Sequence, residues 1–231
     1  MAQFDFSLLL SGQYHDWLIA GLLMSLQLTA SCLLLALPLG IGVALLRLSP
    51  WRALRGLGWL YVESIRNVPL LPQLLFWYFA APELLPAAWK EWLYQQNVEM
   101  IAATVGLTLY TAAYMAEDVR SGVRAVPQGQ LEAARSLGFG FLPAMRLVVL
   151  PQALRVTVPP LISQTLNLWM NTSVTTVIGA GELMYQAARV ESNSFRSAEA
   201  FAFATACYLA VSLAISALGS WYQRHYPVRA A

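Results

Sequence analysis

The sequence predicts an all-α integral membrane protein with five transmembrane helices and one short helix at the cytoplasmic face. Of the 231 residues, 58% are hydrophobic and only 11% are charged, whereas soluble domains carry about a quarter charged residues. Several apolar runs exceed the roughly 20 residues that a helix needs to cross a bilayer. Open strands cannot cross lipid, and runs this long are too continuously apolar for the strands of a membrane barrel.

The apolar runs define a single transmembrane domain over residues 1–231, with no internal repeat in the sequence. In chain order, the five spans are predicted at residues 20–46, 57–80, 100–119, 160–178 and 200–221. Residues 122–158, between the third and fourth spans, are too polar to cross and are predicted to lie in water.

The distribution of basic residues predicts the orientation, because cytoplasmic loops are enriched in Lys and Arg. Lys90, Arg189 and Arg196 lie on one side of the predicted spans. Ten arginines lie on the other side: Arg47, Arg52, Arg55, Arg120, Arg124, Arg135, Arg146, Arg155, Arg224 and Arg229. We therefore expect the arginine-rich side to be cytoplasmic, with the N-terminus outside and the C-terminus inside.

The polar segment between spans three and four contains a predicted helix that starts near Pro127 and stops at Gly138. Proline is favoured at a helix start and glycine just after a helix end. Ala133 and Ala134 carry almost no side chain, so another protein can approach this helix closely. An ordinary solvated loop is the alternative interpretation.

The motifs of this segment resemble those of permease subunits of ATP-binding-cassette importers. Glu132-Ala133-Ala134, Gly138, Val148 and Leu150-Pro151 fit the family signature, with Val148 in place of isoleucine. Further motifs are similar to the polar amino acid branch: Ala113-Tyr114-Met115-Ala116-Glu117, Pro127-Gln128-Gly129-Gln130, Asn171-Thr172-Ser173 and Glu182-Leu183. The resemblance covers about residues 60–220 and is closest to permeases of glutamate/aspartate importers.

The resemblance implies that the short helix is a coupling helix, which docks into a groove of a cytoplasmic ATPase. The residues expected to make this contact are Gln130, Leu131, Glu132, Ala133, Ala134, Leu137 and Gly138. It also implies two ATPase subunits, a second permease subunit that is similar or identical, and a periplasmic solute-binding protein. The chain would be a multi-pass protein of the bacterial inner membrane.

ATP and Mg²⁺ are expected on the partner ATPase and not on this chain. The sequence has no G-x-x-x-x-G-K-S/T stretch, and its single lysine, Lys90, lies on the predicted external side. We expect no cofactor, no metal site and no catalytic residue here, since neither His15 nor His225 has a metal-ligand neighbour at useful spacing. The chain is thus expected to be a non-ATPase subunit of an amino acid translocase.

Charged residues inside predicted spans are costly and mark partners or pathways. Glu63 and Arg66 stand three residues apart in the second span. They either pair with each other or Arg66 meets the carboxylate of a passing substrate. Glu117 and Arg120, at the end of the third span, are interpreted as a structural ion pair.

The fourth span carries the strongest polar cluster, with Asn167, Asn171, Thr172 and Ser173. Asn171 lies 12 residues beyond Pro159, or about 18 Å along a helix, which is near the middle of the bilayer. Transporters place substrate sites at that depth, whereas Ser and Thr also serve helix packing in lipid.

The sequence thus predicts that this subunit moves a polar, acidic amino acid into the cytoplasm by alternating access. Where many relatives of the resembled family read Lys-Asp-Thr-Ser, this chain reads Met170-Asn171-Thr172-Ser173, and an amide in place of a carboxylate disfavours a cationic substrate. The alternative is a stand-alone secondary transporter or channel for a small polar solute, against which stands the absence of an inverted repeat.

Overall fold

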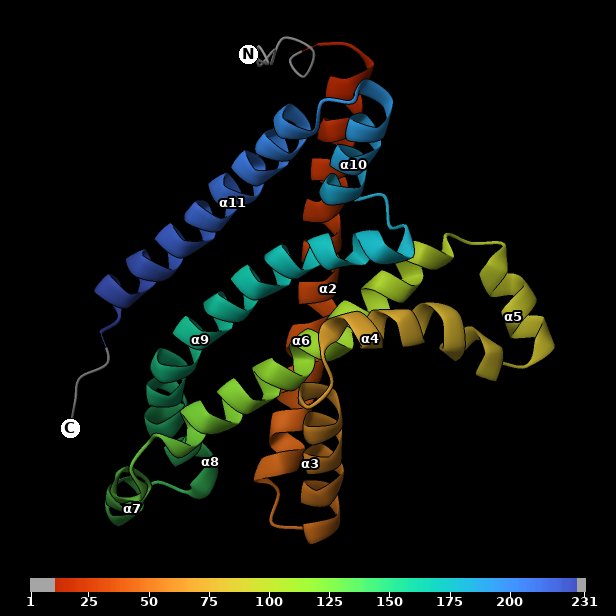
Figure 1. Ribbon diagram of the computed structural model, residues 1–231. Helices are drawn as coiled ribbons and strands as arrows, with labels where there is room; N and C mark the ends of the chain where they lie inside the picture. Colours follow the sequence, from red (N-terminus) through yellow and green to blue (C-terminus); the bar gives the residue numbers. More distant parts are fainter. Residues whose placement is uncertain (1–10, 228–231) are drawn as a thin grey trace.

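All secondary structure in residues 11–227, the part that the computed structural model describes, is helical (Figure 1). This confirms the predicted all-α fold class. Arg229, one of the predicted cytoplasmic charges, lies outside the described residues. The helical elements, where η denotes a 3-10 or π-helical segment, are α2 (Gln13–Leu48), α3 (Arg52–Arg66), α4 (Leu70–Leu75), η1 (Phe76–Ala80), η2 (Ala81–Leu84), α5 (Ala87–Tyr94), α6 (Val98–Arg124), α7 (Gln128–Ser136), α8 (Phe141–Ala144), η3 (Met145–Val149), α9 (Leu150–Asn171), η4 (Thr172–Ile178), α10 (Leu183–Ser194) and α11 (Ser197–His225).

Within residues 11–227, four helical segments are long and apolar enough to cross a membrane: α2, α6, Phe141–Ile178 and α11. They contain four of the five predicted spans, and each is longer than predicted. With 36 residues, α2 is about 54 Å long at 1.5 Å per residue. A hydrocarbon core is about 30 Å thick, so this helix extends beyond it or tilts.

The remaining predicted span, the second in the chain at residues 57–80, is not one straight helix. α3 ends at Arg66, and a new helix, α4, begins after Pro69. A residue that precedes a proline is disfavoured in the helical conformation, and Val68 precedes Pro69. The Gln73 side chain donates to the carbonyls of Ile65, at 2.7 Å, and of Val68, at 2.8 Å. Side-chain hydrogen bonds therefore stabilise this break. α3 packs against α2 and α6, whereas α4 turns away from the direction of α3 and packs against α6 (Figure 1).

α6 lies at the centre and packs against both α2 and α9. Small residues allow the close approach of α2 and α6, as is usual for helices in lipid. A Cβ atom at Gly40 of α2 would lie 3.0 Å from the carbonyl oxygen of Ala112 and 3.0 Å from the Cβ of Met115. The backbones of the two helices therefore touch at this point.

A buried carboxylate, that of Glu182, joins α2, α10 and α11 through hydrogen bonds. Glu182 is fully buried and caps α10 by accepting a hydrogen bond from the Tyr185 amide at 2.8 Å. It also accepts hydrogen bonds from the hydroxyls of Tyr208, at 2.7 Å, and Ser25, at 3.3 Å. Both carboxylate oxygens of Glu182 therefore accept hydrogen bonds, as a polar group buried among apolar side chains requires.

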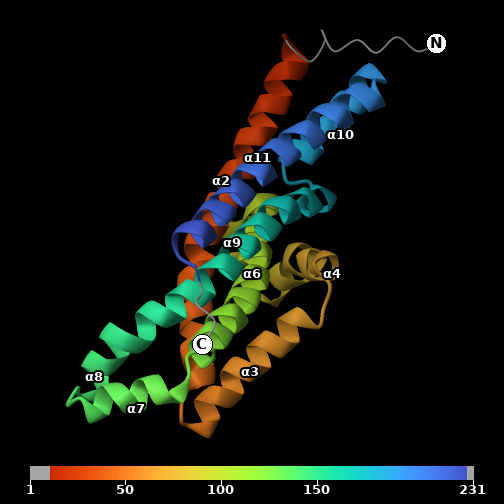
Figure 2. The ribbon, with the colours of Figure 1, turned by 90° about the vertical axis from the view of Figure 1, so that its left-hand side faces the viewer.

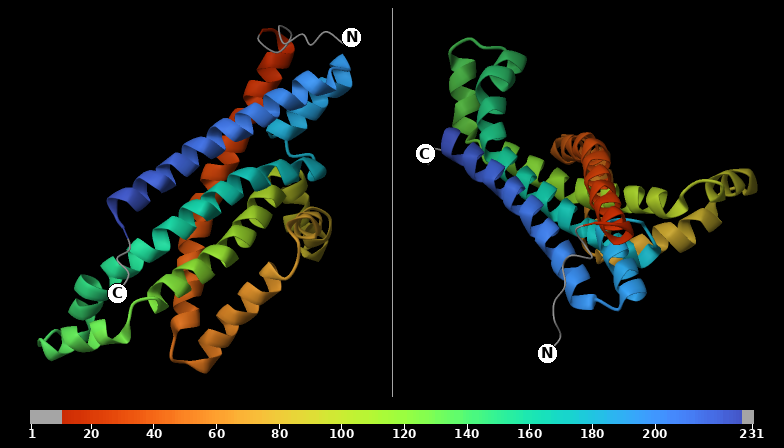
Figure 3. Two further views of the ribbon diagram at one scale, coloured as in Figure 1. Left: turned by 60° about the vertical axis from the view of Figure 1, so that its left-hand side comes forward. Right: turned by 90° about the horizontal axis from the view of Figure 1, so that it is seen from above.

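The predicted water-exposed segment forms a projecting hairpin of α7 and α8 (Figure 2). The hairpin and α5 lie on opposite sides of the molecule, as Figure 1 and the right-hand view of Figure 3 show. The fourth predicted span, residues 160–178, proves to be the later part of a helical segment that already begins at Phe141. Pro159 and Pro160 do not start a helix but lie inside α9, as is tolerated in membrane helices.

Candidate functional site

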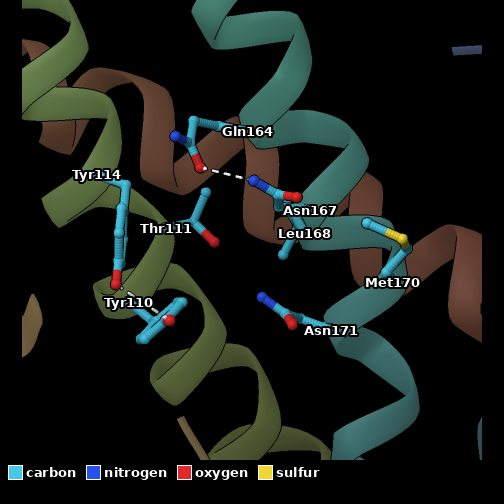
Figure 4. A pocket seen from close by; sticks show the side chains of 8 residues that line it. All are labelled: Tyr110, Thr111, Tyr114, Gln164, Asn167, Leu168, Met170 and Asn171. Atoms are coloured by element: carbon cyan, nitrogen blue, oxygen red, sulfur yellow. Dashed lines mark hydrogen bonds between the residues drawn. The ribbon is translucent and has the colours of Figure 1, made fainter. Parts of the chain in front are cut away.

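A polar pocket of about 350 Å³ lies between α6 and α9 (Figure 4). It is lined by three residues of α6 and five of α9, namely Tyr110, Thr111, Tyr114, Gln164, Asn167, Leu168, Met170 and Asn171. None of these eight residues is charged. Hydroxyl and amide groups gathered at one place between two apolar helices suit a polar ligand better than lipid.

Two of the amides in this pocket are held by a chain of hydrogen bonds. The Gln164 Nε2 donates to the Oδ2 of Asp118 at 3.0 Å. The Asn167 Nδ2 in turn donates to the Oε1 of Gln164 at 3.4 Å. The chain fixes which atom of Gln164 faces the pocket, because its donor is engaged by the carboxylate.

Asn171 has no such partner within the described residues, and its amide points from α9 towards α6 (Figure 4). One carbonyl oxygen and two N–H groups are therefore available to a ligand. Asn171 is half-buried, so a ligand that binds it is partly shielded from water. Asn167 and Asn171 are the two predicted residues of the fourth span that the structure places in the pocket.

Thr172 and Ser173, predicted beside Asn171, point elsewhere. Thr172 is fully buried, and its hydroxyl donates to the carbonyl of Trp169 at 2.8 Å. The Ser173 hydroxyl donates to the carbonyl of Met170 at 2.7 Å. Both side chains therefore bond to their own helix and do not line the pocket.

Arg66 and Glu63 do not pair with each other within the described residues. The Glu63 carboxylate accepts from the Asn67 side chain at 3.0 Å. The Arg66 guanidinium instead lies 4.9 Å from the ring centroid of Tyr114, and the Tyr114 hydroxyl accepts from that of Tyr110 at 3.2 Å. The break after α3 explains the outcome, since it frees Asn67 to cap the helix end and turns Arg66 towards α6.

The α6 residues of the pocket were not predicted from the sequence: Tyr114 was named only as part of a family motif, and Tyr110 and Thr111 were not singled out. Tyr110, Thr111 and Tyr114 occupy positions i, i+1 and i+4, so they share one face of a helix. Polar side chains on one face of a predicted span are the signal that identifies them. Which face of α9 they meet is decided only by packing.

The predicted pair of Glu117 and Arg120 is present, and the structure adds a third member. The Arg120 Nε donates to one Glu117 oxygen at 2.8 Å, and the Nη1 of Arg47 donates to the other at 2.7 Å. The cluster joins the last turn of α2 to the C-terminal part of α6. In residues 11–227, no group of three His, Cys, Asp or Glu side chains is placed to hold a metal ion.

The predicted bounds of the short helix agree with α7. Pro127 is its N-cap residue, and Gly138 follows its end with φ +88°. The amide of Phe139 donates to the carbonyl of Ala134 at 3.2 Å, and that of Gly138 to the carbonyl of Arg135 at 3.0 Å. These two bonds form a Schellman motif, in which a left-handed residue satisfies the last carbonyls of a helix.

The exposed face of α7 differs from the predicted one at one position. Ala134 is buried inside the chain, where α7 packs on η3, so it is not free to meet another protein. Gln130, Glu132 and Ala133 are exposed, and Leu131 is half-buried. Apolar exposure is greatest at the turn after α7, where Leu137 is 80% and Leu142 is 78% exposed.

A side-chain hydrogen bond links α7 to α9. The Gln152 Nε2 of α9 donates to the Oε1 of Gln130 in α7 at 3.3 Å.

Residues 36–227 match the family of inner membrane components of binding-protein-dependent transport systems. The chain belongs to this family. As a member, it is a multi-pass inner membrane protein, which agrees with its four long apolar helices. Family membership also decides against the stand-alone transporter or channel.

Comparison with individual relatives narrows the kind of transport system to which such a subunit belongs. The chain is 38% identical over 214 residues to the probable glutamine ABC transporter permease protein GlnM of Bacillus subtilis (strain 168), covering 92% of this chain and 90% of the relative. It is 35% identical over 203 residues to the glutamate/aspartate import permease protein GltJ of Escherichia coli (strain K12), covering 86% and 82%. The crystal structure of an amino acid ABC transporter with histidines superposes with a TM-score of 0.84 at 31% identity, covering 96% of this chain and 99% of that one.

The family and these relatives make the chain a permease subunit of an amino acid ABC transporter. Such permeases are not themselves enzymes, because ATP hydrolysis belongs to a partner subunit.

Proposed function

We propose that this permease moves an amino acid with a carboxylate or carboxamide side chain into the cytoplasm, and that the substrate passes through the pocket between α6 and α9. The pocket lining carries the proposal: it offers amides and phenol hydroxyls and no carboxylate of its own. A cationic side chain would find no carboxylate in the lining, since the nearby Asp118 accepts a hydrogen bond from Gln164. Glutamine and glutamate/aspartate are the substrates that the names of two relatives print.

Within the pocket, Asn171 is assigned to the substrate because its amide has no partner within the described residues. Asn167 and Gln164, on the same helix as Asn171, form a preorganised part of the lining through Asp118. Arg66, close to Tyr114, supplies positive charge on the path of the substrate's α-carboxylate. Thr172 and Ser173 hold the local shape of α9 and η4, and Glu63 holds the end of α3.

Transport is driven by a separate ATPase through α7. In this proposal two ATPase subunits, which hold ATP and Mg²⁺, bind the α7–α8 end of two permease subunits, similar or identical. A periplasmic solute-binding protein delivers the substrate at the other end. Closure of the ATPase pair moves α7, and α7 is joined to α9 by the bond between Gln130 and Gln152. The pocket thereby changes from outward to inward access.

Reconstitution tests the proposal. The permease, with its ATPase and binding protein in liposomes, is expected to take up glutamate, aspartate or glutamine when ATP is enclosed, and to leave arginine and lysine outside. Uptake of arginine or lysine in preference to the other three would refute the assignment of substrate class. Uptake that is unchanged in Asn171→Leu would refute the pocket while leaving the transporter class intact.

Labelling tests the orientation. Single cysteines near Lys90 and at Ser194 are expected to react with an impermeant maleimide from outside intact cells, and one at Gln130 only after permeabilisation. Reaction at Gln130 in intact cells would reverse the orientation and remove α7 from the ATPase side.

A further inference from the structure

A second cavity, of about 470 Å³, lies where the end of α2, the start of α3 and the end of α6 meet. Five of the residues that line it are arginines, and the lining comprises Arg47, Arg52, Arg55, Gly56, Trp59, Arg120 and Arg124. We refer to this cavity as the arginine cleft. It is separate from the pocket between α6 and α9, with which it shares no lining residue.

The charge in the arginine cleft is not balanced by the protein. Glu117 is the one carboxylate that reaches its arginines in the described residues, and both of its oxygens are engaged, one by Arg47 and one by Arg120. Arg52, Arg55 and Arg124 have no acidic partner within residues 11–227. The cleft therefore holds five guanidinium groups against a single carboxylate, and it attracts an anion.

The geometry of the cleft suits a phosphate group. Arg52 and Arg55 are three residues apart on α3, and Arg120 and Arg124 are four apart on α6, so each pair shares one helix face. Guanidinium groups bind phosphate oxygens through paired N–H donors. Gly56 also lines the cleft, and a Cβ atom there would meet nothing within 4 Å, so the space beside this residue is open.

The surroundings of the cleft suit the rest of a lipid. Trp59 lines the cleft and is 53% exposed, and Leu60, on the adjoining face of α3, is 56% exposed. Exposed apolar side chains on a membrane protein face acyl chains, and Trp side chains are enriched at the level of the headgroups. The arginines and the apolar surface of α3 are thus adjacent, as the two parts of a phospholipid require.

We propose that the arginine cleft binds the phosphate-bearing headgroup of an anionic glycerophospholipid, with its acyl chains along Trp59 and Leu60. Basic pockets between membrane helices on the cytoplasmic side are suited to such headgroups. The α7–α8 hairpin projects away from the α2–α3 corner in both Figure 1 and Figure 2, so the lipid and the proposed ATPase contact occupy different surfaces. The lipid holds the ends of α2, α3 and α6 together, next to the Glu117 cluster.

Binding to the purified transporter complex, stripped of lipid in neutral detergent, tests the proposal by native mass spectrometry. Dioleoyl phosphatidylglycerol is expected to stay bound at detergent concentrations that remove dioleoyl phosphatidylcholine. The variant Arg52→Gln/Arg55→Gln/Arg124→Gln is expected to lose this preference, at about fivefold weaker binding per arginine removed. The matched control Arg146→Gln/Arg155→Gln/Arg224→Gln removes three equally exposed arginines outside the cleft and is expected to bind like the wild type.

Equal retention of phosphatidylglycerol by the cleft variant and the wild type would overturn the proposal. So would glycerol 3-phosphate binding as tightly as the lipid, because the cleft would then be a site for soluble anions. In the assembled complex, Trp59→p-benzoylphenylalanine is expected to crosslink to lipid on illumination. Crosslinking to the ATPase would instead make the cleft a protein contact. These readouts measure binding and not transport, so they are independent of the function proposed above.

Discussion

The pocket between α6 and α9 and the helix α7 are both polar features of an apolar chain, yet they are built in different ways. α7 takes its shape from about a dozen consecutive residues, between Pro127 and Gly138. The pocket joins residues that lie more than fifty positions apart, such as Tyr110 and Asn167. A local feature fails when one backbone angle is changed, whereas a tertiary feature fails when a contact across helices is lost.

The largest expected effect is at the end of α7. Gly138 has φ +88°, a conformation that costs a β-branched residue about 1–3 kcal/mol. Gly138→Val is therefore expected to displace the turn that carries Leu137 and to reduce uptake close to background, while the long helices still insert. ATPase co-purification and substrate-stimulated hydrolysis measure the loss. Normal values of both, together with normal uptake, would show that α7 is not the coupling element.

A smaller effect is expected in the pocket. Asn171→Leu keeps the volume of the side chain and removes its hydrogen-bonding groups, which leaves polar groups of the bound substrate unpaired at a cost of about 1–3 kcal/mol. The apparent KM for uptake is expected to rise by roughly 5- to 150-fold while the complex still assembles. Ser173→Ala is the matched control, because the Ser173 hydroxyl bonds to its own helix. An equal loss in both variants would mean that this part of α9 serves packing alone.

Arg66 is expected to contribute less, because it approaches Tyr114 from an exposed position. A cation above an aromatic ring at an exposed site is worth about 0.5–1 kcal/mol. Arg66→Gln is expected to lower uptake about two- to fivefold, and to do so equally for glutamate and glutamine, since both carry the same α-carboxylate. Arg66→Lys retains the charge and is expected to retain most of the uptake. A loss confined to glutamate would instead assign Arg66 to the side chain of the substrate.

The smallest effect is expected at Gly129, a glycine within α7. A Cβ atom there would meet nothing within 4 Å. Alanine is favoured over glycine inside a helix by about 1 kcal/mol, so Gly129→Ala is expected to leave uptake and ATPase binding unchanged. The same two measurements as for Gly138→Val make the pair directly comparable. A loss at Gly129 equal to that at Gly138 would show that the exposed surface of α7, and not its backbone geometry, is the sensitive feature.

The sequence by itself determined the features that depend on short-range physics. Apolar runs located the four long membrane helices of the described residues, because a helix that crosses lipid must be mainly apolar over about 20 residues wherever it lies in the fold. Pro127 and Gly138 located α7, because the φ angles they favour mark the ends of a helix wherever it lies in space. The ion pair of Glu117 and Arg120 followed from their spacing on one helix.

Only the tertiary structure decided which helix faces meet. It placed Asn171 opposite Tyr110 and Thr111 but turned Thr172 into the core. It also placed the Arg66 guanidinium next to the Tyr114 ring and not next to the Glu63 carboxylate. In α7, it buried Ala134 against η3 while the neighbouring Ala133 stayed exposed. Rotation of one helix about its axis leaves its sequence, its length and its internal hydrogen bonds unchanged, so those properties cannot fix the rotation. The contacts between helices fix it, such as the close approach of α2 and α6 at Gly40.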